Sequence, residues 1–221
     1  MVRVKAQAVI AVAVMLAGCS STGTSDYSEF YRALRQSVAA SFGNGRVTKE
    51  QAAAIPNASM GYRLNGASEQ LVVLATDANG EQLWTSKART VIVTRGGRIT
   101  RTVGLPHDKT GMSPKTGELP AVAAALNASV TYTRLEDFPD IPAYGVALTC
   151  TLSKKGVETV VILGRGIPTI RIDETCRTAD QKWSFTDRFW LDPDGTMAWR
   201  SLQHLAPEGT VIETEILRPP G

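Results

Sequence analysis

The stretch YGVALTCTL, residues 144–152, alternates large apolar side chains with small or polar ones, residue by residue. Side chains of a β-strand point to opposite faces in turn, so this pattern predicts a strand with one apolar and one polar face. Such a strand is typical of an antiparallel sheet that packs one face on a core and turns the other to solvent. The stretch therefore predicts an antiparallel β protein.

Similar short runs, rich in Val, Ile, Thr and aromatic residues, recur along the chain with turn residues between them. About ten runs are expected to form strands: residues 71–76, 81–86, 90–95, 98–103, 144–152, 158–163, 169–173, 183–191, 197–202 and 211–217. The turns include Gly96-Gly97, which permits the positive φ angles of a tight hairpin, and Lys154-Lys155-Gly156. Because the runs do not alternate with helices, we expect a mainly β fold, an antiparallel meander that closes into a β-barrel or curls into a half-barrel.

Helices are expected mainly before the strands. Residues 26–40 carry apolar side chains four apart, as on one face of an N-terminal helix: Phe30, Leu34 and Val38. Residues 48–54 predict a second short helix that ends before Pro56. The longest irregular stretch is 105–126, and residues 120–127 near its end predict a short alanine-rich helix.

The beginning of the chain has the pattern of an export signal. Arg3 and Lys5 precede an apolar run over residues 6–17, and Leu16-Ala17-Gly18-Cys19 is similar to the lipobox of bacterial lipoproteins. As a helix the run reaches only about 18 Å, against about 30 Å of membrane hydrocarbon. We therefore expect cleavage before Cys19 and lipidation of its thiol. The alternative is an ordinary secretory signal followed by a chance cysteine.

This signal sets the expected domain organisation and location. Residues 1–18 form the lipoprotein signal peptide, 19–25 a flexible tether of small polar residues, and 26–221 a single β-rich periplasmic domain. Lipoproteins of this class resemble one another in carrying three acyl chains, such as palmitate. Asp after the lipidated cysteine commonly marks retention at the inner membrane, and this chain has Ser20 there. The resemblance implies anchoring in the outer membrane, facing the periplasm.

Composition describes an ordinary globular chain, with 43% apolar and 20% charged residues. The formal charge is only +3, and Arg3 and Lys5 of the signal contribute two of these charges, so no nucleic-acid partner is implied. Once Cys19 is acylated, Cys150 and Cys176 remain. The periplasm favours oxidation, so we expect a disulfide between them; the alternative is two separate buried thiols.

The search for catalytic chemistry finds little. His107 and His204 lie far apart, and the chain lacks a His-Glu-x-x-His zinc motif and a Gly-x-Ser-x-Gly nucleophile turn. We therefore expect no catalytic residues, no metal and no cofactor. A polysaccharide-modifying enzyme remains a third hypothesis, because it needs only an acid/base pair of carboxyl groups. The candidates are Asp173, Glu174 and Asp187.

Two clusters are candidate surfaces for a glycan or a partner. The last hairpin gathers aromatic residues, which offer platforms for sugar rings and equally for core packing: Trp183, Phe185, Phe189, Trp190 and Trp199. Basic residues gather around the Gly96-Gly97 turn, where they would meet acidic sugars or lipid phosphates, or form a solvated edge: Arg89, Arg95, Arg98 and Arg101. Outward charges such as Arg101 and Arg188 argue against strands that span a membrane.

A family resemblance rests on motifs spread over the predicted domain. They are Trp84, the stretch Gly97-Arg98-Ile99-x-Arg101-Thr102-x-Gly104-Leu105, the stretch Phe189-Trp190-Leu191-Asp192-x-Asp194-Gly195, Ser201-x-Gln203, Pro207 and Ile216-Leu217-Arg218-Pro219. In these residues the chain resembles the YjbF/GfcB lipoproteins. The resemblance implies an outer-membrane-anchored β-barrel domain encoded with exopolysaccharide or group 4 capsule secretion functions. It also implies partners of two types: an outer-membrane β-barrel lipoprotein (YjbH/GfcD) and a small periplasmic protein (YjbG/GfcC). Cys150 and Cys176 are not features that we associate with this family.

Two functions of different kinds follow. The first is a non-enzymatic lipoprotein that assists exopolysaccharide or capsule assembly or secretion by docking on outer-membrane or periplasmic partners. The alternative is a carrier that holds a lipid or acyl chain in the cavity of a barrel. The barrel interior discriminates between them, since bulky side chains filling it exclude the carrier, whereas a dry cavity of several hundred Å³ favours it.

Overall fold

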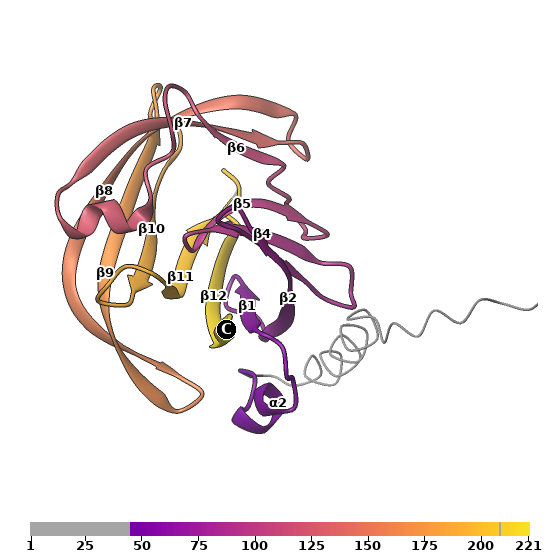
Figure 1. Ribbon diagram of the computed structural model, residues 1–221. Helices are drawn as coiled ribbons and strands as arrows, with labels where there is room; N and C mark the ends of the chain where they lie inside the picture. The colour runs from indigo at the N-terminus through magenta and orange to yellow at the C-terminus, as the bar shows by residue number, and fades with distance from the viewer. Residues whose placement is uncertain (1–44, 208) are drawn as a thin grey trace, which may run out of the picture.

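The computed structural model describes residues 45–207 and 209–221 of the chain (Figure 1). A short α-helix and a 3-10 helix accompany twelve strands in this part: α2 (Lys49–Ala53), β1 (Ser59–Leu64), β2 (Gln70–Ala78), β3 (Glu81–Thr85), β4 (Val91–Arg95), β5 (Arg98–Val103), β6 (Gly111–Pro114), η1 (Val122–Leu126), β7 (Val130–Phe138), β8 (Ala143–Ile162), β9 (Arg165–Thr178), β10 (Ser184–Leu191), β11 (Ala198–His204) and β12 (Val211–Arg218). None of the described helices is long and apolar enough to cross a membrane. The expected helix over residues 26–40 lies outside the described residues.

All twelve strands form one antiparallel sheet, in the order β5-β4-β3-β2-β1-β12-β11-β10-β9-β8-β7-β6. Neighbours in sequence are neighbours in the sheet, and the first strand pairs with the last, so the sheet curls round on itself (Figure 1). Its two ends, β5 and β6, meet at a seam, where the Thr102 N–H donates a hydrogen bond of 2.7 Å to the Lys109 carbonyl. The predicted mainly β meander is confirmed as a nearly closed, barrel-like sheet.

The strand prediction was wrong in two respects. Lys154-Lys155-Gly156 is not a turn: β8 runs through it for 20 residues, and the pairing with β9 shifts there by a β-bulge. The strands β1, β6 and β7 were not predicted. Charged residues occupy every second position in the middle of β7, β1 contains Gly61, and β6 is short and ends in Pro114, so none presents a run of alternating apolar residues.

Apolar side chains fill the interior of the first half of the sheet. The cluster joins β1, β2, β3, β4, β5 and β12, and its buried members are Met60, Tyr62, Val72, Trp84, Ile92, Ile99, Leu105, Leu205, Ile212 and Ile216. Trp84 at its centre is fully buried, and its indole N–H donates to Thr94 Oγ1 at 3.0 Å. Burial of large side chains of this kind contributes about 1.5–3 kcal/mol each. We call this set the apolar core.

The short helix α2 covers part of the outer face of the same half. Ala52 of the helix and Ile55 pack with Leu71 and Val73 of β2 in a second apolar cluster. The Thr48 side chain accepts a hydrogen bond from the Gln51 N–H, and the Gln51 side chain accepts one from the Thr48 N–H, which is a capping box. The predicted helix over residues 48–54 is confirmed.

The β8–β9 hairpin is longer than its neighbours. β7 pairs with β8 only as far as Leu152, and β10 pairs with β9 only from Ile170 onward. Residues 153–169 therefore continue as a two-stranded extension, which we call the hairpin arm. In Figure 1 the long hairpin runs down the left side and ends at the bottom of the view. Leu163 at its tip packs against the cluster beneath α2.

Candidate functional site

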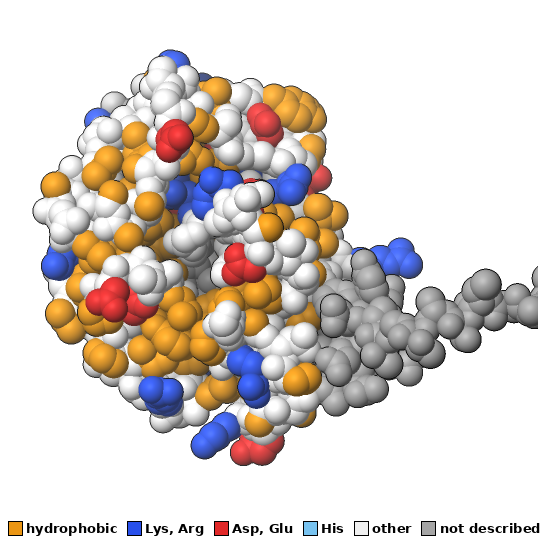
Figure 2. Space-filling view, viewed as in Figure 1, with side chains coloured by type: hydrophobic (Ala, Val, Ile, Leu, Met, Phe, Trp, Pro, Cys, Tyr) orange, Lys and Arg blue, Asp and Glu red, His pale blue; other side chains and the backbone are white. Residues whose placement is uncertain are grey.

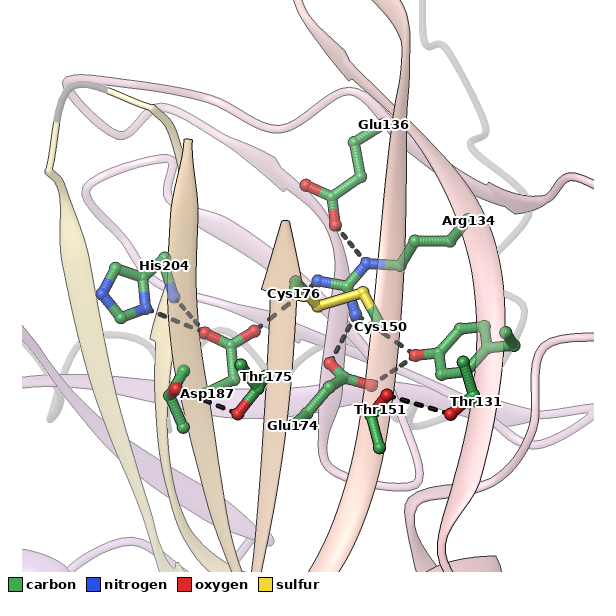
Figure 3. The surroundings of a disulfide bond; sticks show 12 residues. Thr131, Arg134, Glu136, Cys150, Thr151, Glu174, Thr175, Cys176, Asp187 and His204 are labelled. Carbon is green, nitrogen blue, oxygen red and sulfur yellow. Dashed lines mark hydrogen bonds and ion pairs between the residues drawn. A yellow bond between two sulfur atoms is a disulfide. The ribbon is translucent and has the colours of Figure 1, made fainter. Parts of the chain in front are cut away.

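Buried charged side chains lie among apolar ones in the interior of the second half of the sheet. Arg134 of β7 is fully buried, and its Nε lies 2.7 Å from Glu136 Oε1. Its Nη1 contacts Glu174 of β9, and its Nη2 lies 3.6 Å from Asp187 Oδ2 of β10. Glu174 and Asp187 are directly opposite each other in the sheet, where like charges repel. Figure 3 shows the guanidinium among the three carboxylates, where it offsets this repulsion.

Two further cations reach this site from the seam. Arg98 of β5 places Nη2 at 2.7 Å from Glu174 Oε1, and its Nη1 donates to the Pro120 carbonyl at 2.9 Å. The Lys109 Nζ lies 3.2 Å from Glu136 Oε1. Three cations thus face three carboxylates, and all six side chains are buried: Arg98, Lys109, Arg134, Glu136, Glu174 and Asp187. We call this set the ionic clasp, because it ties the seam to the opposite wall of the sheet.

The clasp moves the pKa values of its members in different directions. Burial alone would raise the pKa of Glu174, but Arg134 and Arg98 outweigh it and hold that pKa well below its usual range. Burial raises the pKa of Asp187, and the hydrogen bond from His204 and the charge of Arg134 only partly oppose it. Burial also raises the pKa of Tyr132, whose hydroxyl donates to Glu174. Glu174 is therefore more firmly ionised than Asp187.

A hydrogen-bonded group of neutral side chains continues the clasp along β11. Gln203 accepts from the Ile99 N–H at 2.9 Å and donates to the Gly97 carbonyl at 2.8 Å and to Ser201 Oγ at 2.7 Å. A Cβ atom on Gly97 would overlap the Ala198 side chain, so only glycine allows the β4–β5 turn to approach β11 so closely. Several residues that carry the family resemblance thus fix the β4–β5 hairpin against β11, across the interior of the sheet.

A disulfide lies beside the clasp. Cys150 and Cys176 are directly opposite each other on β8 and β9, both are fully buried, and their sulfur atoms are bonded. Figure 3 shows this bond close to Arg134 and Glu174. It covalently fixes the register of the strand that carries Glu174 against its neighbour.

His204 takes part in the same network from its edge. Its Nδ1 lies 2.9 Å from Asp187 Oδ1, and its backbone N–H donates to the same oxygen at 2.8 Å. Of the three acids considered for catalysis, Glu174 and Asp187 belong to the clasp, and Asp173 pairs with Arg171 at 2.7 Å. The structure thus gives each acid an ion-pair partner. The described residues contain no group of three or more His, Cys, Asp or Glu side chains suited to a metal ion.

The structure separates the predicted basic surface. Arg98 does not lie on a surface: it is buried in the clasp, because the β4–β5 hairpin turns it inward. Arg95 is exposed and pairs with Glu81 at 3.9 Å, and Arg101 is exposed on β5. The hypothesis of a glycan or partner surface here retains the exposed residues Arg89, Arg95 and Arg101.

The three tryptophans of the last hairpin have separate surroundings. Trp183 packs against Phe138 and Phe185, with ring centroids 5.5 and 4.4 Å away. The Trp190 indole N–H donates to Glu158 Oε2 at 2.7 Å, and Trp199 packs against the apolar core. All three are partly buried. They do not form one aromatic platform, so packing within the sheet describes them better than a shared sugar site.

An open hollow lies at one end of the sheet. Figure 2 shows it near the middle of the face seen in Figure 1, with Lys and Arg side chains above it and apolar side chains below. A cavity of about 290 Å³ lies among the turns at this end, and polar side chains line it together with methionines: Met60, Asp77, Gln82, Thr94, Thr196, Met197 and Thr214. Deeper in, large side chains of the apolar core and the clasp fill the interior. This filling argues against the acyl-chain carrier.

Sequence reasoning missed three members of the clasp, namely Lys109, Arg134 and Glu136. Charged residues at alternate positions of a chain ordinarily indicate a solvent-facing strand. The available signal was the order Tyr132-x-Arg134-x-Glu136-x-Phe138, in which aromatic residues flank the charges at the same spacing. The aromatic residues mark that face as the inner one.

The fold and the filled interior define a class, a mainly β domain built as a barrel-like twelve-strand meander. A solved structure of the hypothetical lipoprotein YmcC from Escherichia coli (K12) shares this fold with a TM-score of 0.68 and 24% identity, over 87% of this chain and 95% of that one. Residues 31–217 match the family model described as "Group 4 capsule polysaccharide lipoprotein gfcB, YjbF", and the chain belongs to this family.

Relatives in Escherichia coli (strain K12) match nearly the whole chain. The lipoprotein YjbF is 24% identical over 217 residues, which cover 97% of this chain and 98% of YjbF. The lipoprotein GfcB is 27% identical over 212 residues, which cover 94% of this chain and 95% of GfcB. The family is thus one of capsule-polysaccharide-associated lipoproteins, and its description names no enzymatic activity.

Proposed function

We propose that this chain is a non-enzymatic outer-membrane lipoprotein that assists capsule or exopolysaccharide assembly or secretion by docking on partner proteins. The observation that carries this proposal is the family match over residues 31–217, because the family is described by its association with the capsule polysaccharide. In the proposal, the lipid on Cys19 holds the domain at the periplasmic face of the outer membrane. Residues 1–18 are removed, and residues 19–25 serve as the tether.

The interior of the described domain supports a docking role. Glu174 and Asp187, which an acid/base mechanism would use, are buried in ion pairs with Arg134. A buried charge held by a buried partner stabilises one geometry of the sheet, and it is not free to exchange protons with a substrate outside. The outer surface of the sheet is then the part that contacts the partner proteins. The proposed partners are an outer-membrane barrel of the YjbH/GfcD type and a periplasmic protein of the YjbG/GfcC type.

A deletion strain tests this proposal. Surface polysaccharide is measured after complementation with the wild-type chain or with Cys19→Ser, at matched protein levels. We expect the wild-type chain to restore surface polysaccharide and to co-purify with an outer-membrane partner after detergent solubilisation, and Cys19→Ser to fail in both. Unchanged polysaccharide in the deletion strain would refute the proposed function. Full complementation by Cys19→Ser would show that anchoring is incidental.

A further inference from the structure

The hairpin arm carries a strand edge that no other strand covers in the described part of the chain. β7 pairs with β8 only as far as Leu152, and residues 153–162 of β8 continue beyond it with β9 on one side only. An unpaired edge presents backbone N–H and C=O groups that can pair with another extended chain. The arm therefore offers up to ten residues of strand edge.

The pairing with β9 determines which backbone groups face this edge. Thr159 is opposite Pro168, which has no N–H, so this pair is not hydrogen-bonded and the Thr159 N–H and C=O point away from β9. The turn gives the same result independently. Leu163 and Gly164 both have positive φ, as in a two-residue hairpin whose closing pair, Ile162 and Arg165, is hydrogen-bonded. Hydrogen-bonded and non-hydrogen-bonded pairs alternate along two antiparallel strands. Counted from Thr159 or from the turn, the backbone N–H and C=O groups of three residues face the free edge: Val157, Thr159 and Val161.

The side chains of the same residues are exposed. Val157 is 76% exposed and Val161 is 57% exposed, whereas Val160 and Ile162 between and beyond them are only 3% and 4% exposed. The arm thus packs one face against the body and turns an apolar, β-branched face outward. Such side chains pack well against those of a neighbouring strand.

The other long edge of the sheet, that of β5, is blocked from within. The Ile99 N–H donates to the Gln203 side chain, the Thr102 N–H to the Lys109 carbonyl and the Gly104 N–H to Asp108. Of the outward-facing backbone groups of Val157, Thr159 and Val161, only the Val161 carbonyl has a comparable contact within the described residues, from Arg200 Nη2 at 3.2 Å. In the described part of the chain, one edge is thus protected and the other is open at Val157 and Thr159.

We infer that the edge of β8 at Val157–Val161 is where a partner protein adds an extended strand, in the manner of β-augmentation. This inference rests on the proposed docking function and names its surface. The added strand carries apolar side chains at alternate positions, opposite Val157 and Val161. It is acidic at its ends, because the exposed cations Lys154 and Lys155 flank one end of the edge and Arg165 the other.

Charge argues against a second copy of this chain as the occupant. Antiparallel pairing of two copies about Thr159 would place Lys154 of one copy opposite Gly164 of the other and beside its Arg165. The same crowding of cations would occur at both ends of the paired strands. Like charges in such positions repel, so an acidic strand of another protein fits better.

Photo-crosslinking in cells tests the inference. A photoreactive residue replaces Val157 in the full-length lipidated chain, produced in the deletion strain, and a second site at Val103 is the control. Val103 is 50% exposed and lies on the blocked strand β5. We expect a crosslinked product with a different protein from position 157 and none from position 103.

A substitution at Thr159 shows whether the product depends on strand pairing. Thr159→Pro removes the outward N–H without removing a bond to β9, and Thr159→Val keeps the N–H and loses only the hydroxyl. We expect Thr159→Pro to reduce the product about tenfold, as loss of edge hydrogen bonds predicts, and Thr159→Val to leave it unchanged. If Thr159→Pro does not accumulate, Val161→Lys, which places a charge on the exposed apolar face, is expected to reduce the product similarly.

Several results would overturn the inference. They are a product with the mass of two copies, a crosslink within the chain to residues before Gly45, no product, and a product that neither Thr159→Pro nor Val161→Lys diminishes. If either variant restores surface polysaccharide as well as the wild-type chain does, while the deletion strain lacks it, the proposed function stands and the edge is not its docking surface.

Discussion

The two halves of the sheet differ in what they bury. Apolar side chains around Trp84 fill the half formed by β1 to β5 and β12, whereas the half formed by β7 to β10 buries the ionic clasp around Arg134 together with apolar side chains such as Leu152 and Phe189. Apolar burial contributes stability roughly in proportion to the apolar area removed from water. A buried ion pair gains little net stability, because desolvation offsets the attraction, but removal of one member leaves an uncompensated charge. The apolar half therefore stabilises the fold, and the charged half specifies how the sheet closes.

The position of the clasp supports this division. Arg98 and Lys109 lie at the seam, and their partners Glu174 and Glu136 lie on β9 and β7. The seam itself has few backbone hydrogen bonds, of which the one between Thr102 and Lys109 is an example. Opening the seam would separate buried charges from their partners, so the ion pairs favour the closed arrangement.

The largest effect is expected from Arg134→Met, which removes the central cation and keeps a long side chain. Glu136, Glu174 and Asp187 would then share two remaining cations, and we expect a loss of about 3–5 kcal/mol in the free energy of unfolding, measured by urea denaturation. The double variant Arg134→Met/Glu174→Gln serves as the control, because it removes one charge of each sign. A loss below 1 kcal/mol for the single variant would contradict the role given to the clasp.

A somewhat smaller effect is expected when both cysteines of the charged half become alanine. The disulfide joins residues separated by 26 positions, and loop-closure entropy predicts a loss of about 3.5 kcal/mol for Cys150→Ala/Cys176→Ala. Thermal unfolding with and without reductant measures it. The wild-type chain should lose stability on reduction and the double variant should not. Equal sensitivity of both would contradict the prediction.

Acid should weaken the charged half more than the apolar half. The pKa of Glu174 is lower folded than unfolded, so its contribution is complete above the unfolded value, near 4.3, and is lost as pH falls below it toward the folded value. The raised pKa of Asp187 acts in the opposite direction and reduces the net change. We expect a net loss of about 1–2 kcal/mol between pH 5 and pH 2, measured by urea denaturation. The loss should disappear in Glu174→Gln.

The smallest effect is expected in the apolar core. Ile92→Val removes one methylene from a fully buried side chain and should cost about 1 kcal/mol, without a change in the acid dependence. The same urea measurement at two pH values checks this. A loss that depends on pH in this variant would show that the two halves are coupled. It would contradict the separate roles given to them.

The apolar half could be predicted from the sequence better than the charged half. The reason lies in the same difference between what the two halves bury. Alternation of apolar residues identified the mainly β meander and most hairpins, because burial of one strand face is a local signal. The clasp joins residues far apart in sequence, such as Arg98 and Glu174, 76 positions apart. A charge at an alternate position looks solvent-exposed until its partner is known. Lys154-Lys155-Gly156 likewise has the composition of a turn, and only the pairing of β9 with both sides of it reveals a bulge.

The pairing of β1 with β12 has a consequence for how the chain reaches its native state. Ser59 pairs with Arg218, so the strand that is synthesised first cannot complete its pairing until the last strand has been synthesised. Contacts between such distant segments form slowly, because the entropy of a long loop is lost before the contact is gained. Until β12 arrives, one edge of β1 and part of the apolar interior are open, and such intermediates tend to aggregate. Even a short C-terminal truncation should therefore impair folding yield more than its few contacts suggest.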